Sequence, residues 1–89
     1  MKVRELKNFL ELQMDEPKAR DSLNRFSHWI TAIFQAKEYV TSNPKDVTML
    51  ERLKDLNIIS LRVEKSQYIA ELTSVGRKLY QDFYAHGYY

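Results

Sequence analysis

The hydrophobic period of this chain changes at Asn57, and this change narrows the possible folds more than any other feature. Before Asn57, apolar residues recur at every third position of residues 44–56: Val47, Leu50, Leu53 and Leu56. This spacing predicts an amphipathic helix, and asparagine tolerates the left-handed conformation just past a helix end. From residue 59 to residue 72, apolar and polar residues alternate instead, which predicts β-strands.

The alternating segment predicts a β-hairpin over 59–72 with a defined register. The turn is expected to close at Glu64–Gln67, with Lys65 and Ser66 at the tip. The apolar pairs across the two strands are then Val63 with Tyr68, Leu61 with Ala70, and Ile59 with Leu72. All six share one face, as packing on a core requires, whereas Arg62 and Ile69 fall on the other face.

Helices are also predicted before residue 41. The first spans residues 1–14, and its inner face carries Val3, Leu6, Phe9, Leu10 and Gln13. This spacing is that of an amphipathic helix, and Pro17 prevents its continuation because the residue before a proline avoids the helical conformation. Residues 18–40 contain a longer apolar stripe, which predicts a central helix, either continuous or divided into two by a bend.

Cap residues mark the limits of the two later helices. Ser42 or Asn43 is suited to cap the helix that precedes the hairpin. Thr73 is equally suited to cap a last helix over 74–85. Gly76 falls in the first turn of that last helix, where glycine costs about 1 kcal/mol relative to alanine. Its presence there indicates that another element passes close by.

The length of the chain and its lack of cysteine limit how it is stabilised. With 89 residues it is expected to form one domain, 1–89, and a domain this small buries only about 60% of its unfolded surface. It contains no cysteine, which excludes disulfides and thiolate metal sites. The two histidines, His28 and His86, are too far apart to suggest a zinc site. We therefore expect no metal and no cofactor, and we expect a homodimer to supply further stability.

Charge and hydropathy argue against several classes of protein. No apolar run approaches the roughly 20 residues that span a membrane, and glutamates interrupt the first segment, which is therefore unlike a signal peptide. We expect a cytoplasmic protein with no membrane contact and no small-molecule ligand. A phosphate-binding loop and a nucleophile elbow are both missing, so an enzyme is not expected. The net charge is only +2.

The order of these elements resembles the second half of winged helix-turn-helix domains, such as those of MarR-like and PadR-like prokaryotic regulators. The residues that carry the resemblance are Leu53, Leu56, Asn57, Ile58 and Ile59, then Leu72, Thr73, Gly76 and Leu79. It covers roughly residues 42–83. The resemblance implies a mainly α (α+β) fold with a two-stranded β-hairpin wing and a C-terminal helix. It also implies a small transcriptional regulator that binds double-stranded DNA.

In such a fold the 44–56 helix enters the major groove with its N-terminal half. The DNA contacts expected from the resemblance are Ser42, Asn43, Lys45, Asp46, Thr48, Met49 and Arg52 on the helix, with Arg62, Lys65 and Ser66 on the wing. Arg52 suits a guanine, Asn43 an adenine and Thr48 a thymine methyl group. Ser42, at the helix N-terminus, suits a phosphate, and the wing residues suit the flanking backbone. The alternative is an ordinary amphipathic helix with a solvated face.

Aromatic residues are concentrated at the C-terminus, where we expect a homodimer interface. They are Tyr80, Phe83, Tyr84, Tyr88 and Tyr89. Tyrosine and phenylalanine are enriched in the cores of protein interfaces. The expected dimer residues are Tyr80, Phe83 and Tyr84, with Leu6, Phe9 and Leu10 as partners from the first helix. Packing of these residues in the core of a single chain is the alternative.

A second function stays open, namely a winged-helix module that binds protein and not DNA. The near-neutral charge and the aromatic residues favour it. The two functions predict different surfaces around the 44–56 helix. A DNA-binding protein is expected to show Lys45, Arg52, Arg62 and Lys65 on one contiguous face. A protein-binding module is expected to show an apolar patch in that place, or to have that face buried by a partner.

Overall fold

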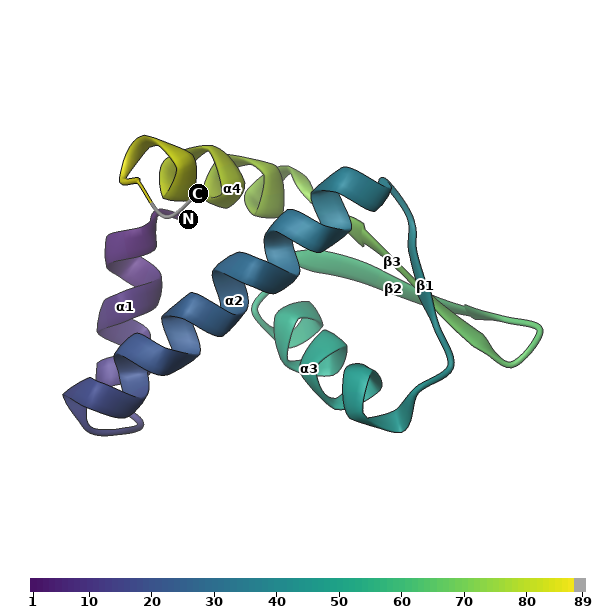
Figure 1. The fold of residues 1–89 in the computed structure, drawn as a ribbon, viewed down its shortest axis with the longest axis horizontal. Coiled ribbons are helices and arrows are strands. Elements are labelled where there is room, and N and C mark those ends of the chain that lie inside the picture. The colour runs from purple at the N-terminus through teal and green to yellow at the C-terminus, as the bar shows by residue number, and fades with distance from the viewer. Residues whose placement is uncertain (88–89) are drawn as a thin grey trace.

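Four helices and a three-stranded antiparallel sheet make up residues 1–87, which are the residues that the computed structural model describes (Figure 1). In chain order the elements are α1 (Val3–Glu11), α2 (Glu16–Ala36), β1 (Tyr39–Thr41), α3 (Pro44–Asp55), β2 (Ile59–Glu64), β3 (Gln67–Leu72) and α4 (Ser74–Ala85). Helix α2 crosses the middle of the molecule, with α4 on one side and α3 on the other (Figure 1). The architecture is that of a small, mainly helical α+β domain. Tyr88 and Tyr89 of the expected aromatic cluster lie outside the described residues.

The central segment forms one continuous helix, α2, which is shorter than the predicted 18–40. The helix ends at Ala36, and the φ of 65° at Lys37 turns the chain out of it. Tyr39 and Val40 were predicted to be helical, but they belong to strand β1, because pairing with β3 draws them into the sheet. Within residues 1–87, neither this helix nor any other has both the length and the apolar character needed to cross a membrane.

The sheet has the strand order β1-β3-β2, so the predicted two-stranded hairpin is joined by a third strand. Within the hairpin the register agrees with the prediction, with Leu61 opposite Ala70 and Val63 opposite Tyr68. Burial along these pairs is uneven, because Ile59 is buried whereas Val63 is 60% exposed. The predicted apolar face is therefore covered from the base of the hairpin to the Leu61–Ala70 pair, and the tip extends beyond the core (Figure 1).

Helix α3 is not preceded directly by a second helix. In a helix-turn-helix unit, two helices are joined by a turn of about three or four residues. Here residues 37–43 separate α2 from α3, and they contain strand β1. The part of the expected arrangement that is present is helix α3 followed at once by the β2–β3 hairpin, with β1 along the far edge of β3.

The start of α4 is tied to the loop between α3 and β2. The Thr73 hydroxyl donates a hydrogen bond to the Asn57 carbonyl oxygen at 2.7 Å and accepts one from the Gly76 N–H at 3.1 Å. Gly76 lies so close to the Ile58 carbonyl oxygen that a Cβ atom would overlap with it. The prediction that another element passes close to this glycine is confirmed. These contacts fix the base of the hairpin against α4.

Three residues predicted at a dimer interface belong instead to the core of the chain. Leu6 and Leu10 are each 1% exposed and Phe83 is 0% exposed, because α1 and α4 both pack against α2. The Val3 N–H also donates to the Asp82 carboxylate at 2.7 Å, which joins α1 to α4. A partner could reach these side chains only if the helices separated. The dimer prediction is therefore wrong for Leu6, Leu10 and Phe83.

Candidate nucleic-acid interface

The turn before α3 is built from side chains that the sequence assigned to DNA contacts. The Asn43 side chain caps the helix and accepts a hydrogen bond from the Lys45 N–H at 3.0 Å. The Asp46 carboxylate accepts one from the Thr41 hydroxyl at 2.8 Å, and the same hydroxyl accepts the Asn43 N–H at 3.1 Å. Asn43 and Asp46 thus hold the turn between β1 and α3 together, and the bond to Lys45 uses the Asn43 side-chain oxygen that the prediction assigned to an adenine.

The outward surface of α3 and its preceding turn is polar and mixed in charge. Ser42, Lys45 and Thr48 are exposed, as the prediction requires. The Thr48 hydroxyl donates to the carbonyl oxygen one helical turn earlier, at 3.3 Å. Glu51 and Asp55 are exposed on the same helix, and their negative charge repels phosphate. Both halves of the helix therefore carry charges of both signs, with Asp46 in the first turn and Arg52 and Lys54 in the last.

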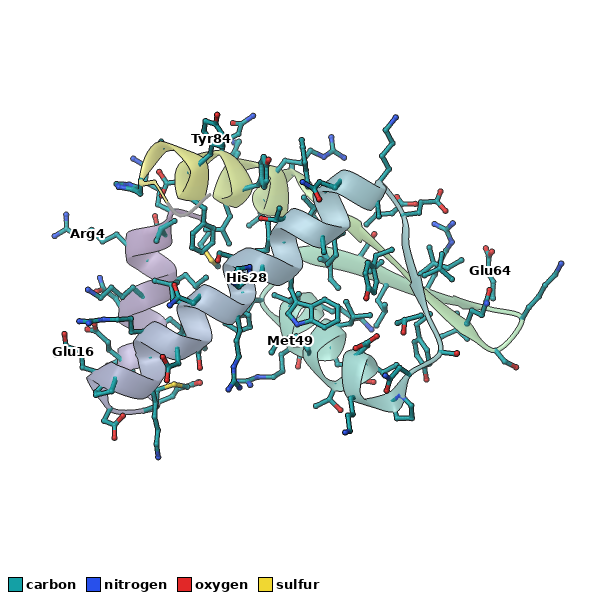
Figure 2. All side chains as sticks on the ribbon, viewed as in Figure 1. Arg4, Glu16, His28, Met49, Glu64 and Tyr84 are labelled. Carbon is teal, nitrogen blue, oxygen red and sulfur yellow. The ribbon has the colours of Figure 1, made fainter. Side chains whose placement is uncertain are left out.

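Two of the predicted DNA contacts lie toward α2. Met49 is half-buried and packs against the core, on the side of α3 that faces α2 (Figure 2). Arg52 is exposed, but its guanidinium carbon lies 5.8 Å from the centre of the Phe26 ring of α2, within the range of a cation–π attraction. Met49 is therefore a packing residue, whereas Arg52 places a positive charge at the seam between α2 and α3.

The tip of the hairpin is a tight turn formed by Lys65 and Ser66. Their φ angles are 49° and 65°, and positive φ at both central residues is the geometry of a type I′ turn. This turn suits the right-handed twist of the two strands. Both side chains are exposed, and the tip lies at the end of the molecule opposite α1 (Figure 1). The structure thus presents Lys65 to solvent where a wing residue was expected.

Arg62 does not fit the phosphate contact predicted for it, because carboxylates surround it. Its guanidinium donates to Glu71 at 2.9 Å, to Glu64 at 3.2 Å and to Glu38 at 3.3 Å. The hydrogen bond to Glu71, reinforced by the charges of Glu64 and Glu38, raises the pKa of the Arg62 guanidinium above its ordinary value. The cluster holds one positive and three negative groups, so it repels phosphate.

A DNA-binding face was expected to bring together Lys45, Arg52, Arg62 and Lys65. One of these four cations is not available to a phosphate. Arg62 is neutralised on the face of the sheet that also carries Ile69. By contrast, Lys45, Arg52 and Lys65 take part in no ion pair formed within residues 1–87. Three of the four cations are thus able to meet a phosphate, from α3 and from the tip of the hairpin.

An aromatic surface lies along α2 and α4, on the side of α2 away from α3. Phe34 stacks on Tyr80 with 4.0 Å between the ring centres and 13° between the planes. Tyr84, one turn further along α4, is 67% exposed and points outward (Figure 2). Of the residues predicted for a homodimer, Phe9, Tyr80 and Tyr84 are at least partly exposed. The homodimer stays a prediction that rests on these three residues.

The glutamates around Arg62 are site residues that the sequence analysis missed. The predicted register already placed Arg62 opposite Ile69, and alternation along a strand puts Glu64 and Glu71 on the same face. Two of the three glutamates that pair with Arg62 could therefore be predicted from the sequence. Glu38 was not, because its approach depends on strand β1, which the helical pattern before it conceals.

The comparisons with known proteins found no match: no family model fits the sequence, and no curated protein and no solved structure is significantly similar to it. The function is therefore inferred from the surfaces of the molecule. Among residues 1–87, no three or more His, Cys, Asp and Glu side chains are placed to hold a metal ion. The candidate binding surfaces are the exposed side of α3, the hairpin tip and a groove between α2, β3 and α4.

Proposed function

We propose that the protein binds double-stranded DNA as a winged-helix-type domain, with α3 in the major groove and the hairpin tip against the flanking backbone. The observation that carries this proposal is the position of the hairpin, which follows α3 directly and extends beyond the core with Lys65 at its tip. Lys45 and Arg52 on α3 add positive charge, because neither forms an ion pair with another described residue. Phosphate contacts from two separate elements position such a domain on a duplex.

The proposed binding is weak and depends little on sequence. Three cations, Lys45, Arg52 and Lys65, correspond to a slope of about −3 when the logarithm of affinity is plotted against the logarithm of salt concentration. Few groups are left to distinguish bases, because Asn43 and Asp46 are used within the fold. A small regulator of this kind would gain specificity as a homodimer that engages two half-sites.

Fluorescence anisotropy of a labelled random-sequence duplex, titrated with protein at a series of salt concentrations, tests the proposal. A linear loss of log affinity with log salt, with a slope of about −3, supports it. An absence of binding at the lowest salt contradicts it. The matched control is the double variant Lys2→Ala/Arg4→Ala, which removes two exposed cations at the start of α1, the helix at the end of the molecule opposite the hairpin tip (Figure 1). Its slope is expected to stay close to that of the unmodified protein.

A protein-binding domain is the second candidate, and two observations favour it. The carboxylates around Arg62 make the outer face of the sheet unsuited to a nucleic acid. Large apolar side chains are also exposed, with Phe34 at 44% and Val40 at 48%. Such a domain would fail to bind the duplex in the titration, so the same measurement separates the two candidates.

A further inference from the structure

A groove is lined by residues at the end of α2, on strand β3 and at the start of α4. Its lining consists of Ile33, Phe34, Lys37, Glu71, Leu72 and Arg77, and its volume is about 210 Å³. A cavity of about 150 Å³ accommodates a benzene ring. The groove therefore has room for one large apolar side chain.

One wall of the groove is apolar and held in place before any ligand arrives. Ile33 is fully buried beneath the groove and Leu72 is 8% exposed, so the core packing holds this apolar wall in a fixed position. Phe34 is 44% exposed, and its stack on Tyr80 restricts the orientation of its ring. A wall that is already ordered lowers the entropic cost of binding.

The charged rim of the groove is predominantly positive. Lys37 and Arg77 are exposed, and neither joins an ion pair within residues 1–87. Glu71 is the single carboxylate among the lining residues of the groove, and its ion pair with Arg62 at 2.9 Å offsets part of its charge. Arg77 lies in the first turns of α4, where the helix dipole adds partial positive charge. The rim is thus complementary to an anionic ligand.

We propose that this groove binds an acidic segment of a partner protein, with one bulky apolar side chain in the groove and carboxylates against Lys37 and Arg77. A nucleic-acid backbone would meet the two cations but would leave the apolar wall of Phe34 and Leu72 unfilled. An acidic peptide with an aromatic or aliphatic residue satisfies both features. No residue of α3 lines the groove, so this site does not depend on DNA binding.

Nuclear magnetic resonance of ¹⁵N-labelled protein, titrated with the synthetic peptide acetyl-Glu-Asp-Glu-Phe-Leu-Asp-Glu-amide, tests the proposal. The expected result is saturable shift changes centred on the amides of Phe34, Lys37, Leu72 and Arg77. A second peptide, in which Gly-Ser replaces Phe-Leu, is expected to bind about tenfold more weakly, because burial of one large apolar side chain is worth about that factor.

Variants with reversed charge at the rim of the groove test whether Lys37 and Arg77 bind the acidic peptide. The double variant Lys37→Glu/Arg77→Glu is expected to weaken binding of the acidic peptide at least about tenfold. Lys78→Glu is the control, because Lys78 neighbours Arg77 on α4 but does not line the groove, and it is expected to change affinity less than about twofold. Thermal melts followed by circular dichroism show whether each variant is folded. If the double variant is unfolded, peptide binding is measured with the single variant Lys37→Glu instead, because Lys37 is exposed after the end of α2.

Several results would overturn the proposal. These are an absence of shift changes at millimolar peptide, shift changes centred elsewhere, and undiminished binding by a folded charge-reversed variant. Displacement of the peptide from these amides by duplex DNA would assign the surface to nucleic acid instead. Shift changes at these amides that depend on protein concentration, without peptide, would assign it to a second copy of the chain.

Discussion

The base and the tip of the β2–β3 hairpin share one register but differ in their surroundings. At the base, Ile59 is 2% exposed and Leu72 is 8% exposed, and Thr73 ties the end of β3 to the loop after α3. At the tip, Val63 is 60% exposed and Lys65 faces solvent. The same alternation of apolar residues thus yields core at one end and surface at the other, because the tip extends beyond the core. We infer that the base supplies stability and that the tip is free to make contacts.

The largest expected effect is the loss of a core side chain at the base. Ile59→Ala is expected to lower the free energy of unfolding by about 2–5 kcal/mol, because it removes buried methyl groups and leaves a cavity. Val63→Ala, on the same strand and face, is expected to change it by less than about 0.5 kcal/mol. Urea unfolding followed by circular dichroism measures both. Equal losses in the two variants would remove the distinction between base and tip.

The close approach of Gly76 to the loop after α3 provides the next test. Gly76→Ala is expected to destabilise the protein by about 2 kcal/mol, because its Cβ would overlap the Ile58 carbonyl oxygen and overpacking outweighs the gain in helix propensity. Ser74→Ala, at an exposed position in the same helical turn, is the control and should change stability by less than about 0.5 kcal/mol. A Gly76→Ala protein as stable as the unmodified one would show that this contact is absent.

The Thr73 hydroxyl is expected to have a smaller effect. Thr73→Val keeps the shape of the side chain but removes the cap of α4 and the hydrogen bond to Asn57, so we expect a loss of about 1–2 kcal/mol. Thr73→Ser keeps the hydroxyl and should lose less. The midpoint of thermal unfolding reports both variants, and a Thr73→Val protein as stable as the unmodified one would show that the hydroxyl bonds add no stability.

At the tip, one substitution is expected to stabilise the protein slightly. Ser66 has a φ of 65°, a conformation that glycine adopts without the steric cost of a Cβ atom. Ser66→Gly is therefore expected to raise the free energy of unfolding by about 0.5 kcal/mol, the strain relief being partly offset by the greater flexibility of glycine in the unfolded chain. Urea unfolding measures the change. A destabilised variant would indicate that the turn is not of the type I′ geometry.

The hairpin and the close packing at Gly76 could be predicted from the sequence because both follow from local patterns. Alternation fixes which residues face each other across two strands, and this predicted the pairing of Leu61 with Ala70. A glycine in the first turn of a helix indicated a neighbour, and the Ile58 carbonyl is that neighbour. Such inferences need no knowledge of distant contacts.

Features that depend on distant contacts could not be predicted in this way. Strand β1 contains only three residues, and the helical period before it extends through Tyr39, so no local pattern reveals that Lys37 ends the helix. The spacing of Leu6 and Leu10 shows that they are buried but not whether they pack against this chain or a second copy. For the same reason the sequence does not place Glu38 beside Arg62, whereas Glu64 and Glu71 follow from the predicted register.

The most direct test of DNA binding by α3 and the hairpin tip compares two changes in charge on the same elements. Anisotropy of a labelled duplex at low salt is measured for the double variant Lys45→Ala/Lys65→Ala and for Arg62→Gln. The double variant is expected to lose affinity about tenfold, because two phosphate contacts disappear. Arg62→Gln is expected to change affinity less than about twofold, because Arg62 is held by three glutamates and makes no phosphate contact in the proposed interface. A larger loss in Arg62→Gln than in the double variant would place the DNA on the outer face of the sheet and would contradict the proposed interface.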